Sequence, residues 1–152
     1  MTLVAGAVTV DGQVLNPYDL TVEVLQNEFT AQTVDVTFLS GEETVSTQFT
    51  GVPLWQVIGA AQPNLNADVR NDRISTFIVV TASDGYQAVI AWGEIDPEFG
   101  NANILLAYEE NGAPIEDSQG AIRLVVPTDA RGGRYVSGVV NISLRDAPRV
   151  EN

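Results

Sequence analysis

The residues best suited to chemistry are two arginines that flank a glycine pair, Arg131-Gly132-Gly133-Arg134. Glycines let successive backbone N–H groups converge on an anion, and a guanidinium can hold a phosphate or a carboxylate through two parallel hydrogen bonds. The segment therefore predicts a site for a small anionic ligand. The alternative is a glycine-rich turn whose arginines pair with surface carboxylates, and the excess of acidic residues favours this second interpretation.

A third arginine, Arg123, lies inside the apolar run IRLVV. A guanidinium stays charged at any accessible pH, so burying it without a partner is costly. We therefore expect Arg123 to meet an anionic or carbonyl partner.

The sequence lacks both cysteine and histidine, which removes several chemistries. It offers no thiolate or imidazole nucleophile, no histidine base, no structural zinc site of the usual kind and no haem held by histidine. Disulfides are excluded as well. The absence of cysteine is compatible with a reducing or an oxidising compartment, so it does not assign a location.

Composition indicates an acidic, folded domain. The 152 residues include 45% hydrophobic and 18% charged side chains, with a net charge of −13, and every basic residue is an arginine. This length fits one domain, 1–152, with a real core. The charge makes nucleic acid and anionic membranes poor partners and leaves a basic protein partner conceivable, although solubility alone explains such a charge. No segment predicts a membrane span or a signal peptide.

Two acidic groups of residues have less specific patterns. Asp84, Tyr86 and Glu109 could line a cleft, with Tyr86 as a proton donor, but Asp84 as a turn residue and Tyr86 as half-buried packing are favoured. Glu94, Asp96 and Glu98 alternate as calcium ligands can. A calcium site needs six or more oxygens in a tighter pattern, so a solvated loop is the better interpretation.

The first half of the chain reads mainly as strands. Residues 7–15 predict a strand, a turn at Asp11-Gly12 and a second short strand, followed by a turn over 16–19. Residues 20–27 alternate like a strand, whereas Thr21 as a cap would begin a short helix. Residues 33–39 and 44–49 predict a hairpin. A helix then opens with proline in its first turn, and its apolar face is Leu54, Val57, Ile58 and Ala61.

The second half adds further strands and strong turn signals. Residues 74–82 are apolar and β-branched, which predicts a central strand buried on both faces. Asp84-Gly85 and Asn111-Gly112 are dipeptides that favour tight hairpins. Residues 93–100 predict a loop with one helical turn, and 136–144 a final strand. We expect the core to centre on Phe38, Leu54, Val57, Ile78, Val80, Leu106, Leu124 and Val126.

Five short segments, taken in order, carry a family resemblance. They are GVPL from Gly51, DGY from Asp84, LLAYEENGAPI from Leu105, RLVVP from Arg123 and RYVSGVVNI from Arg134. Together they resemble the molybdopterin-binding domain of the sulfite-oxidase-like oxidoreductases, over roughly residues 20 to 145. The resemblance implies an α+β fold dominated by mixed β-sheet with two or three short helices. It also favours the helix over 20–27.

The resemblance implies a molybdopterin cofactor but not a complete metal site. In the active enzymes a cysteine binds molybdenum, and Phe38 or a neighbour stands where that cysteine would be. The cofactor-binding residues that the resemblance suggests are Arg123, Arg131, Gly132, Gly133 and Arg134. The family pattern has a proline two residues before the arginine that matches Arg123, and GAIR lacks it, so the loop before Arg123 must differ in shape.

Two functions of different class follow from the resemblance. One is a molybdopterin oxidoreductase, or its cofactor-binding module, whose metal lacks a thiolate. The other is a non-catalytic ligand-binding or protein-interaction domain on the same fold, with a pterin, another small anion or a redox protein as its partner. Relatives are usually exported, which implies a periplasmic or secreted location.

Overall fold

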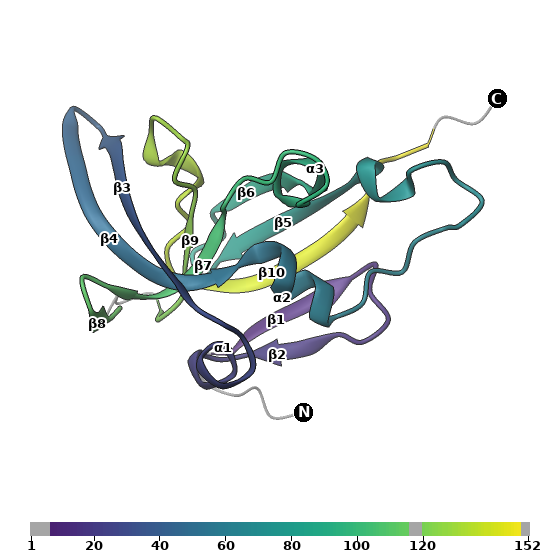
Figure 1. The fold of residues 1–152 in the computed structure, drawn as a ribbon, viewed down its shortest axis with the longest axis horizontal. Helices are drawn as coiled ribbons and strands as arrows, with labels where there is room; N and C mark the ends of the chain where they lie inside the picture. Colours follow the sequence, from purple (N-terminus) through teal and green to yellow (C-terminus); the bar gives the residue numbers. More distant parts are fainter. Residues whose placement is uncertain (1–6, 116–119, 150–152) are drawn as a thin grey trace.

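The computed structural model describes residues 7–115 and 120–149, which form two β-sheets and short helices (Figure 1). The strands in chain order are β1 (Val8–Gly12), β2 (Tyr18–Leu20), β3 (Gln32–Ser40), β4 (Glu43–Pro53), β5 (Thr76–Ala82), β6 (Gln87–Ala91), β7 (Leu105–Glu110), β8 (Ala113–Pro114), β9 (Arg123–Val125) and β10 (Val139–Asp146). The helices are α1 (Val22–Glu28), α2 (Leu54–Ala60) and α3 (Trp92–Ile95), with 3-10 turns η1 (Asp72–Ser75) and η2 (Gly132–Arg134).

One sheet has the strand order β2-β1-β10-β5-β6. Its β1 and β10 are parallel, whereas the other pairs are antiparallel, so the sheet is mixed. The α+β class with mixed sheet and three short α-helices is therefore confirmed. The strand predicted as central, β5, lies second from the edge, between β10 and the edge strand β6. Its residues alternate between buried and half-buried positions rather than being buried on both faces.

The other sheet has the order β3-β4-β7-β8, with β9 also paired to β7. The predicted hairpin of β3 and β4 is confirmed, and it extends to the left of Figure 1, with β9 and the loop that follows beside it. The Asn111-Gly112 turn is also confirmed, since both residues have positive φ, 52° and 82°. The strand after this turn, β8, has only two residues.

The ends of several elements differ from the sequence expectation. Residues 13–15 form no strand with β1, although Val14 makes one bridge to Pro63, and β2 lies instead over the expected turn. Residues 20–27 are helical in the main, because the Thr21 side chain accepts a hydrogen bond from the Val24 N–H at 3.2 Å and so caps α1. Pro53 is the cap residue of α2 and ends β4, so the helix begins one residue later than expected.

The core lies between the sheets and under the helices. All eight residues expected at its centre are buried, and Leu54, Val57, Ile78, Val80, Leu106, Leu124 and Val126 are fully so. The apolar face of α2 is confirmed, because Ala61 is buried along with Leu54, Val57 and Ile58. Within the described residues, no helix has the length and apolar character to cross a membrane.

Candidate functional site

The β3–β4 hairpin positions Phe38. In this antiparallel pair Phe38 lies opposite Val45 and Val34 lies opposite Phe49, so their side chains share one face of the sheet. Side chains alternate along β3, and Val36 and Phe38 are buried on this face while Thr37 is exposed on the other. The expected core role of Phe38 is confirmed.

The loop that holds the glycine pair folds directly onto Phe38. The Leu39 N–H donates to the Ala130 carbonyl at 2.8 Å, and Leu39 bridges to Arg131 in the parallel sense. The Phe38 ring stacks on Tyr135, with centroids 4.2 Å apart and planes at 27°. A Cβ at Gly132 would lie 2.9 Å from the Phe38 ring, so only glycine allows this approach. Phe38 thus fills the space between β3 and this loop.

Arg134 is held by two carboxylates. Its Nε and Nη2 donate to the two oxygens of Asp129, each at 2.8 Å, and its Nη1 donates to Glu94 at 3.0 Å. The hydrogen bonds from Arg134 lower the pKa of Asp129, although partial burial opposes the effect. The same bonds raise the pKa of Arg134 further above its ordinary value. The alternative interpretation, in which the arginines pair with carboxylates, therefore applies to Arg134.

Arg123 has a different environment. Its guanidinium lies over the Phe49 ring, 5.6 Å from the centroid, and its Nε is buried without a hydrogen-bond partner. The Tyr135 hydroxyl is also buried and without a partner. Burial raises the pKa of Tyr135, the charge of Asp129 adds to the increase, and the charge of Arg123 opposes it. Arg123 and Tyr135 therefore each have a buried polar atom without a partner, and the charge of Arg123 acts on the Tyr135 hydroxyl.

Arg131 and Gly133 complete the predicted segment. Arg131 is exposed and makes no ion pair among the described residues. The Gly133 carbonyl accepts a hydrogen bond from the Tyr86 hydroxyl. Tyr86 is 51% exposed, so the expectation of half-buried packing is wrong, and its role is to tie the β5–β6 turn to this loop. Four of the five predicted cofactor residues, 131–134, therefore form one loop, whereas Arg123 lies on β9 with its guanidinium over Phe49.

The other acidic candidates have structural partners. The Tyr86 N–H donates to Asp84 at 3.0 Å, which confirms Asp84 as a turn residue. Glu109 lies on β7 opposite Pro114. The alternating acidic residues do not act together. Glu94 pairs with Arg134, whereas Asp96 is buried and accepts a hydrogen bond from the Trp92 indole N–H at 2.7 Å. The solvated-loop interpretation is thus wrong for Asp96, since burial and the Trp92 bond hold it inside the fold.

The site does not fit a ligated molybdenum ion. The sequence has no cysteine or histidine, and the described residues hold no group of carboxylates placed to bind a metal. A phenyl ring has no lone pair to offer, so Phe38 cannot replace a thiolate. The residues suit the anionic part of a cofactor better than they suit a metal. Among the described residues, the Arg123 Nε, the Tyr135 hydroxyl and the Arg131 side chain have no protein partner.

Sequence reasoning missed Tyr135, Asp129 and the partnership of Glu94 with Arg134. Asp129 lies only five residues before Arg134, and this short separation in the sequence could have indicated a local ion pair. Glu94 lies forty residues away, so only the fold brings it to the loop. The stacking of Tyr135 on Phe38 likewise depends on the approach of the loop to β3.

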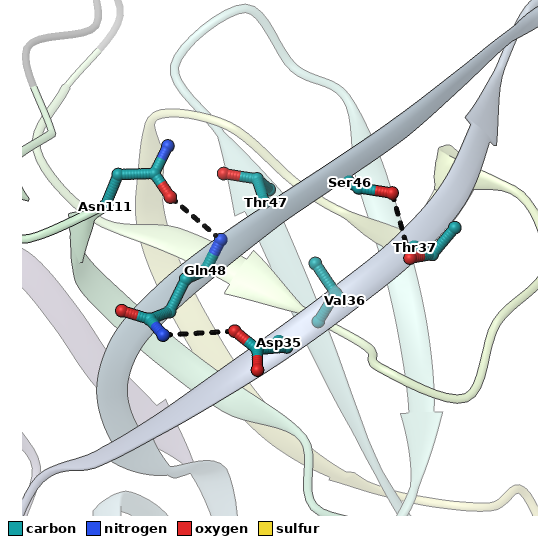
Figure 2. Close-up of a pocket in the computed structure, with 7 residues that line it drawn as sticks. All are labelled: Asp35, Val36, Thr37, Ser46, Thr47, Gln48 and Asn111. Carbon is teal, nitrogen blue, oxygen red and sulfur yellow. Dashed lines mark hydrogen bonds between the residues drawn. The ribbon is translucent and has the colours of Figure 1, made fainter.

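The β3–β4 hairpin also carries a shallow polar hollow of about 530 Å³ (Figure 2). Its polar groups bond to one another: Gln48 to Asp35 at 3.0 Å, Thr37 to Ser46 at 3.1 Å, and the Gln48 N–H to the Asn111 side chain at 3.1 Å. These contacts stabilise the strand pairing and leave few groups directed at a ligand. We therefore assign this hollow a structural role.

A solved structure shares this fold. The crystal structure of the sulfane dehydrogenase SoxCD from Paracoccus pantotrophus matches with a TM-score of 0.72 and 18% sequence identity. The match covers 96% of this chain and 40% of the SoxCD chain, so the present chain spans about two fifths of that protein's length. At this identity the likeness establishes the fold, which is the one that the sequence resemblance implied.

The chain belongs to the family of oxidoreductase molybdopterin-binding domains, whose family model matches residues 6–151. This confirms the resemblance seen in the sequence. A comparison with curated protein sequences gives no significant match.

Proposed function

We propose that this chain is an anion-binding member of the molybdopterin-binding family that does not perform molybdenum redox catalysis by itself. The observation that carries the proposal is the position of Phe38. Its ring packs between Tyr135 and Gly132, in the region where the sequence resemblance assigns the metal-binding cysteine of active relatives. The ring supplies no lone pair for a metal, so it cannot replace a thiolate.

Loss of the thiolate affects the position of a metal as well as its coordination. Oxygen-atom transfer requires reacting atoms at a defined separation, and a displacement of about 1 Å can cost about a hundredfold in rate. Phosphate contacts alone hold a cofactor at its far end and leave the metal end without support. Catalysis by this chain would then need a ligand from elsewhere.

Binding of a small anion is the function that the remaining groups support. Arg123 offers a buried Nε, Tyr135 a buried hydroxyl, and Arg131 an exposed guanidinium at the edge of the same loop. Arg134 is not free to take part, because its three donor nitrogens are engaged by Asp129 and Glu94. Its role in this proposal is to fix the shape of the loop. A phosphorylated pterin is the ligand that family membership favours.

The test of the catalytic part uses expression in a host that makes the cofactor, followed by sulfite-oxidase and reductase assays. We expect no turnover by the unmodified protein. Phe38→Cys supplies the missing thiolate, and Phe38→Ala is its control, since it opens the same space without a ligand. Activity in Phe38→Cys alone would support the proposal, and robust turnover by the unmodified chain would contradict it.

The test of the binding part is a titration with a phosphorylated pterin, followed by the pterin's own fluorescence. Arg123→Met should abolish saturable binding, because it removes the buried donor while keeping much of the apolar volume. Arg145→Met is the matched control, since Arg145 is exposed on β10 and bonds to Ser143 instead. Unchanged affinity in Arg123→Met would remove Arg123 from the site.

A further inference from the structure

Two hollows lie side by side around Trp55, on residues that the anion site does not use. One has a volume of about 380 Å³ and the other about 350 Å³. Trp55 and Pro97 line both, so the hollows adjoin across these two side chains. Each volume falls in the range of small-molecule sites.

The first hollow is lined by four carboxamides and no charged group. They belong to Gln32, Gln56, Asn101 and Asn103. The Asn103 amide donates to the Gln32 carbonyl oxygen at 2.8 Å, whereas the side chains of Gln56 and Asn101 have no hydrogen-bond partner among the described residues. A carboxamide offers both donors and an acceptor, which suits a hydroxyl group because it does the same. The lining therefore favours a neutral ligand rich in hydroxyls.

The second hollow has an aromatic lining. Trp55 and Trp92 both reach it, and the Trp92 indole is fixed by its bond to Asp96. Asp96 also pairs with Arg73 at 3.4 Å, and Arg73 pairs with Glu98 as well. Both carboxylates at this hollow are therefore paired, although they share one cation. Trp55 is half-buried and lines both hollows, so part of its side chain is available for contact with a ligand.

We propose that these hollows form a binding site for a neutral saccharide, with one sugar ring in each hollow and Trp55 stacked against the apolar face of a ring. Carboxamides bind the hydroxyls of the first ring, and the indoles contact the C–H face of the second. The site shares no residue with the anion site at Arg123, so either proposal can fail without the other. A cationic proline-rich peptide is disfavoured, because the first hollow has no carboxylate and the carboxylates of the second are paired to Arg73.

Intrinsic fluorescence tests this proposal directly, because the chain has two tryptophans and both line the second hollow. The probes are cellobiose, maltose and N,N′-diacetylchitobiose, each titrated to high millimolar concentration. We expect a saturable change with at least one of them, unaffected by added sodium chloride since the ligand is uncharged. Insoluble cellulose and chitin then distinguish a free sugar from a polymer, because only a polymer-binding protein sediments with them.

Two variants connect the signal to the site. Trp55→Ala should weaken binding about tenfold or more, measured by calorimetry, because it removes the stacking surface. Gln56→Ala, whose side chain lies outside the core, should weaken it about threefold to tenfold through lost hydrogen bonds. Gln26→Ala, exposed on α1, is the matched control and should bind normally. Circular dichroism of each variant checks folding.

Three results would overturn the proposal. The first is that none of the three saccharides binds saturably. The second is that Trp55→Ala and Gln56→Ala are both folded and bind the saccharide as tightly as the unmodified protein. The third is that an arginine-containing proline-rich peptide binds in a salt-sensitive way and the sugars do not bind.

Discussion

Arg134 and Arg123 are both candidate anion-binding arginines, and their environments differ. Arg134 makes hydrogen bonds to two carboxylates and is part of the loop's own structure. Arg123 lies over Phe49 with its Nε buried and without a partner. The difference shows that a guanidinium near a glycine pair indicates a ligand site only if some of its N–H donors have no partner within the protein.

Phe38 packs against the loop that carries Arg134. Its ring is 6% exposed, stacks on Tyr135 and lies close to Gly132, so it closes the contact between β3 and this loop. The Arg123 Nε and the Tyr135 hydroxyl are buried without partners, in contrast to the donors of Arg134. If this difference is correct, substitutions of Arg134 and Arg123 must have effects of different size and sign.

The largest effect is expected from Phe38→Ala, which removes the ring that closes the loop. It should lower the free energy of unfolding by about 3 to 5 kcal/mol through lost burial and a residual cavity. Phe99→Ala is the control, because Phe99 is 45% exposed and should cost at most about 1 kcal/mol, including its contact with Arg73. Urea unfolding measures both. Equal costs would mean that Phe38 does not close the loop.

A smaller loss is expected from Arg134→Gln. It leaves Asp129 and Glu94 without their shared cation, and charge-assisted hydrogen bonds of this kind contribute about 1 to 3 kcal/mol. Arg131→Gln, at the exposed end of the same segment, should stay within about 0.5 kcal/mol of the unmodified protein. If both substitutions had the same small effect, Arg134 would not be a structural residue.

The Asp129 carboxyl should make this contribution dependent on pH. Its pKa is lowered in the folded protein, so the stabilisation is present above the ordinary aspartate pKa of about 3.9 and is lost as pH falls through the folded value. The unmodified protein should therefore lose stability in acid more steeply than Arg134→Gln. Thermal unfolding across this pH range measures the difference, and parallel curves would contradict the pairing.

The smallest change, and one of opposite sign, is expected from Arg123→Met. Arg123 is half-buried and its Nε has no partner, so replacing it with an apolar side chain of similar length should be neutral or stabilising, by about 0 to 1 kcal/mol. A loss comparable to that of Arg134→Gln would show that Arg123 is a structural residue too, and the contrast between the two arginines would disappear.

Much of the fold could be predicted because its signals are local. Alternation along β3, the Thr21 cap of α1 and the positive φ of Asn111 and Gly112 each depend on neighbouring residues. The strand order could not be predicted, since the insertion of β10 beside β5 is decided by packing across the whole chain.

The site could be predicted only in part for the same reason. The sequence indicates the loop and its arginines, whereas the partner of Arg134 depends on bringing α3 to that loop. The approach of Gly132 to Phe38 depends on the pairing of Leu39 with Arg131, between segments far apart in the chain. The Trp55 hollows gave no sequence signal, because their lining comes from β3, α2 and the loops around α3.

The central claim is that the unmodified chain does not hold a ligated molybdenum ion. The most direct measurement is the ratio of molybdenum to protein after purification from a host that makes the cofactor, with Phe38→Cys purified in parallel. We predict a ratio far below one for the unmodified chain and a higher ratio for Phe38→Cys. Stoichiometric molybdenum in the unmodified chain would contradict the account.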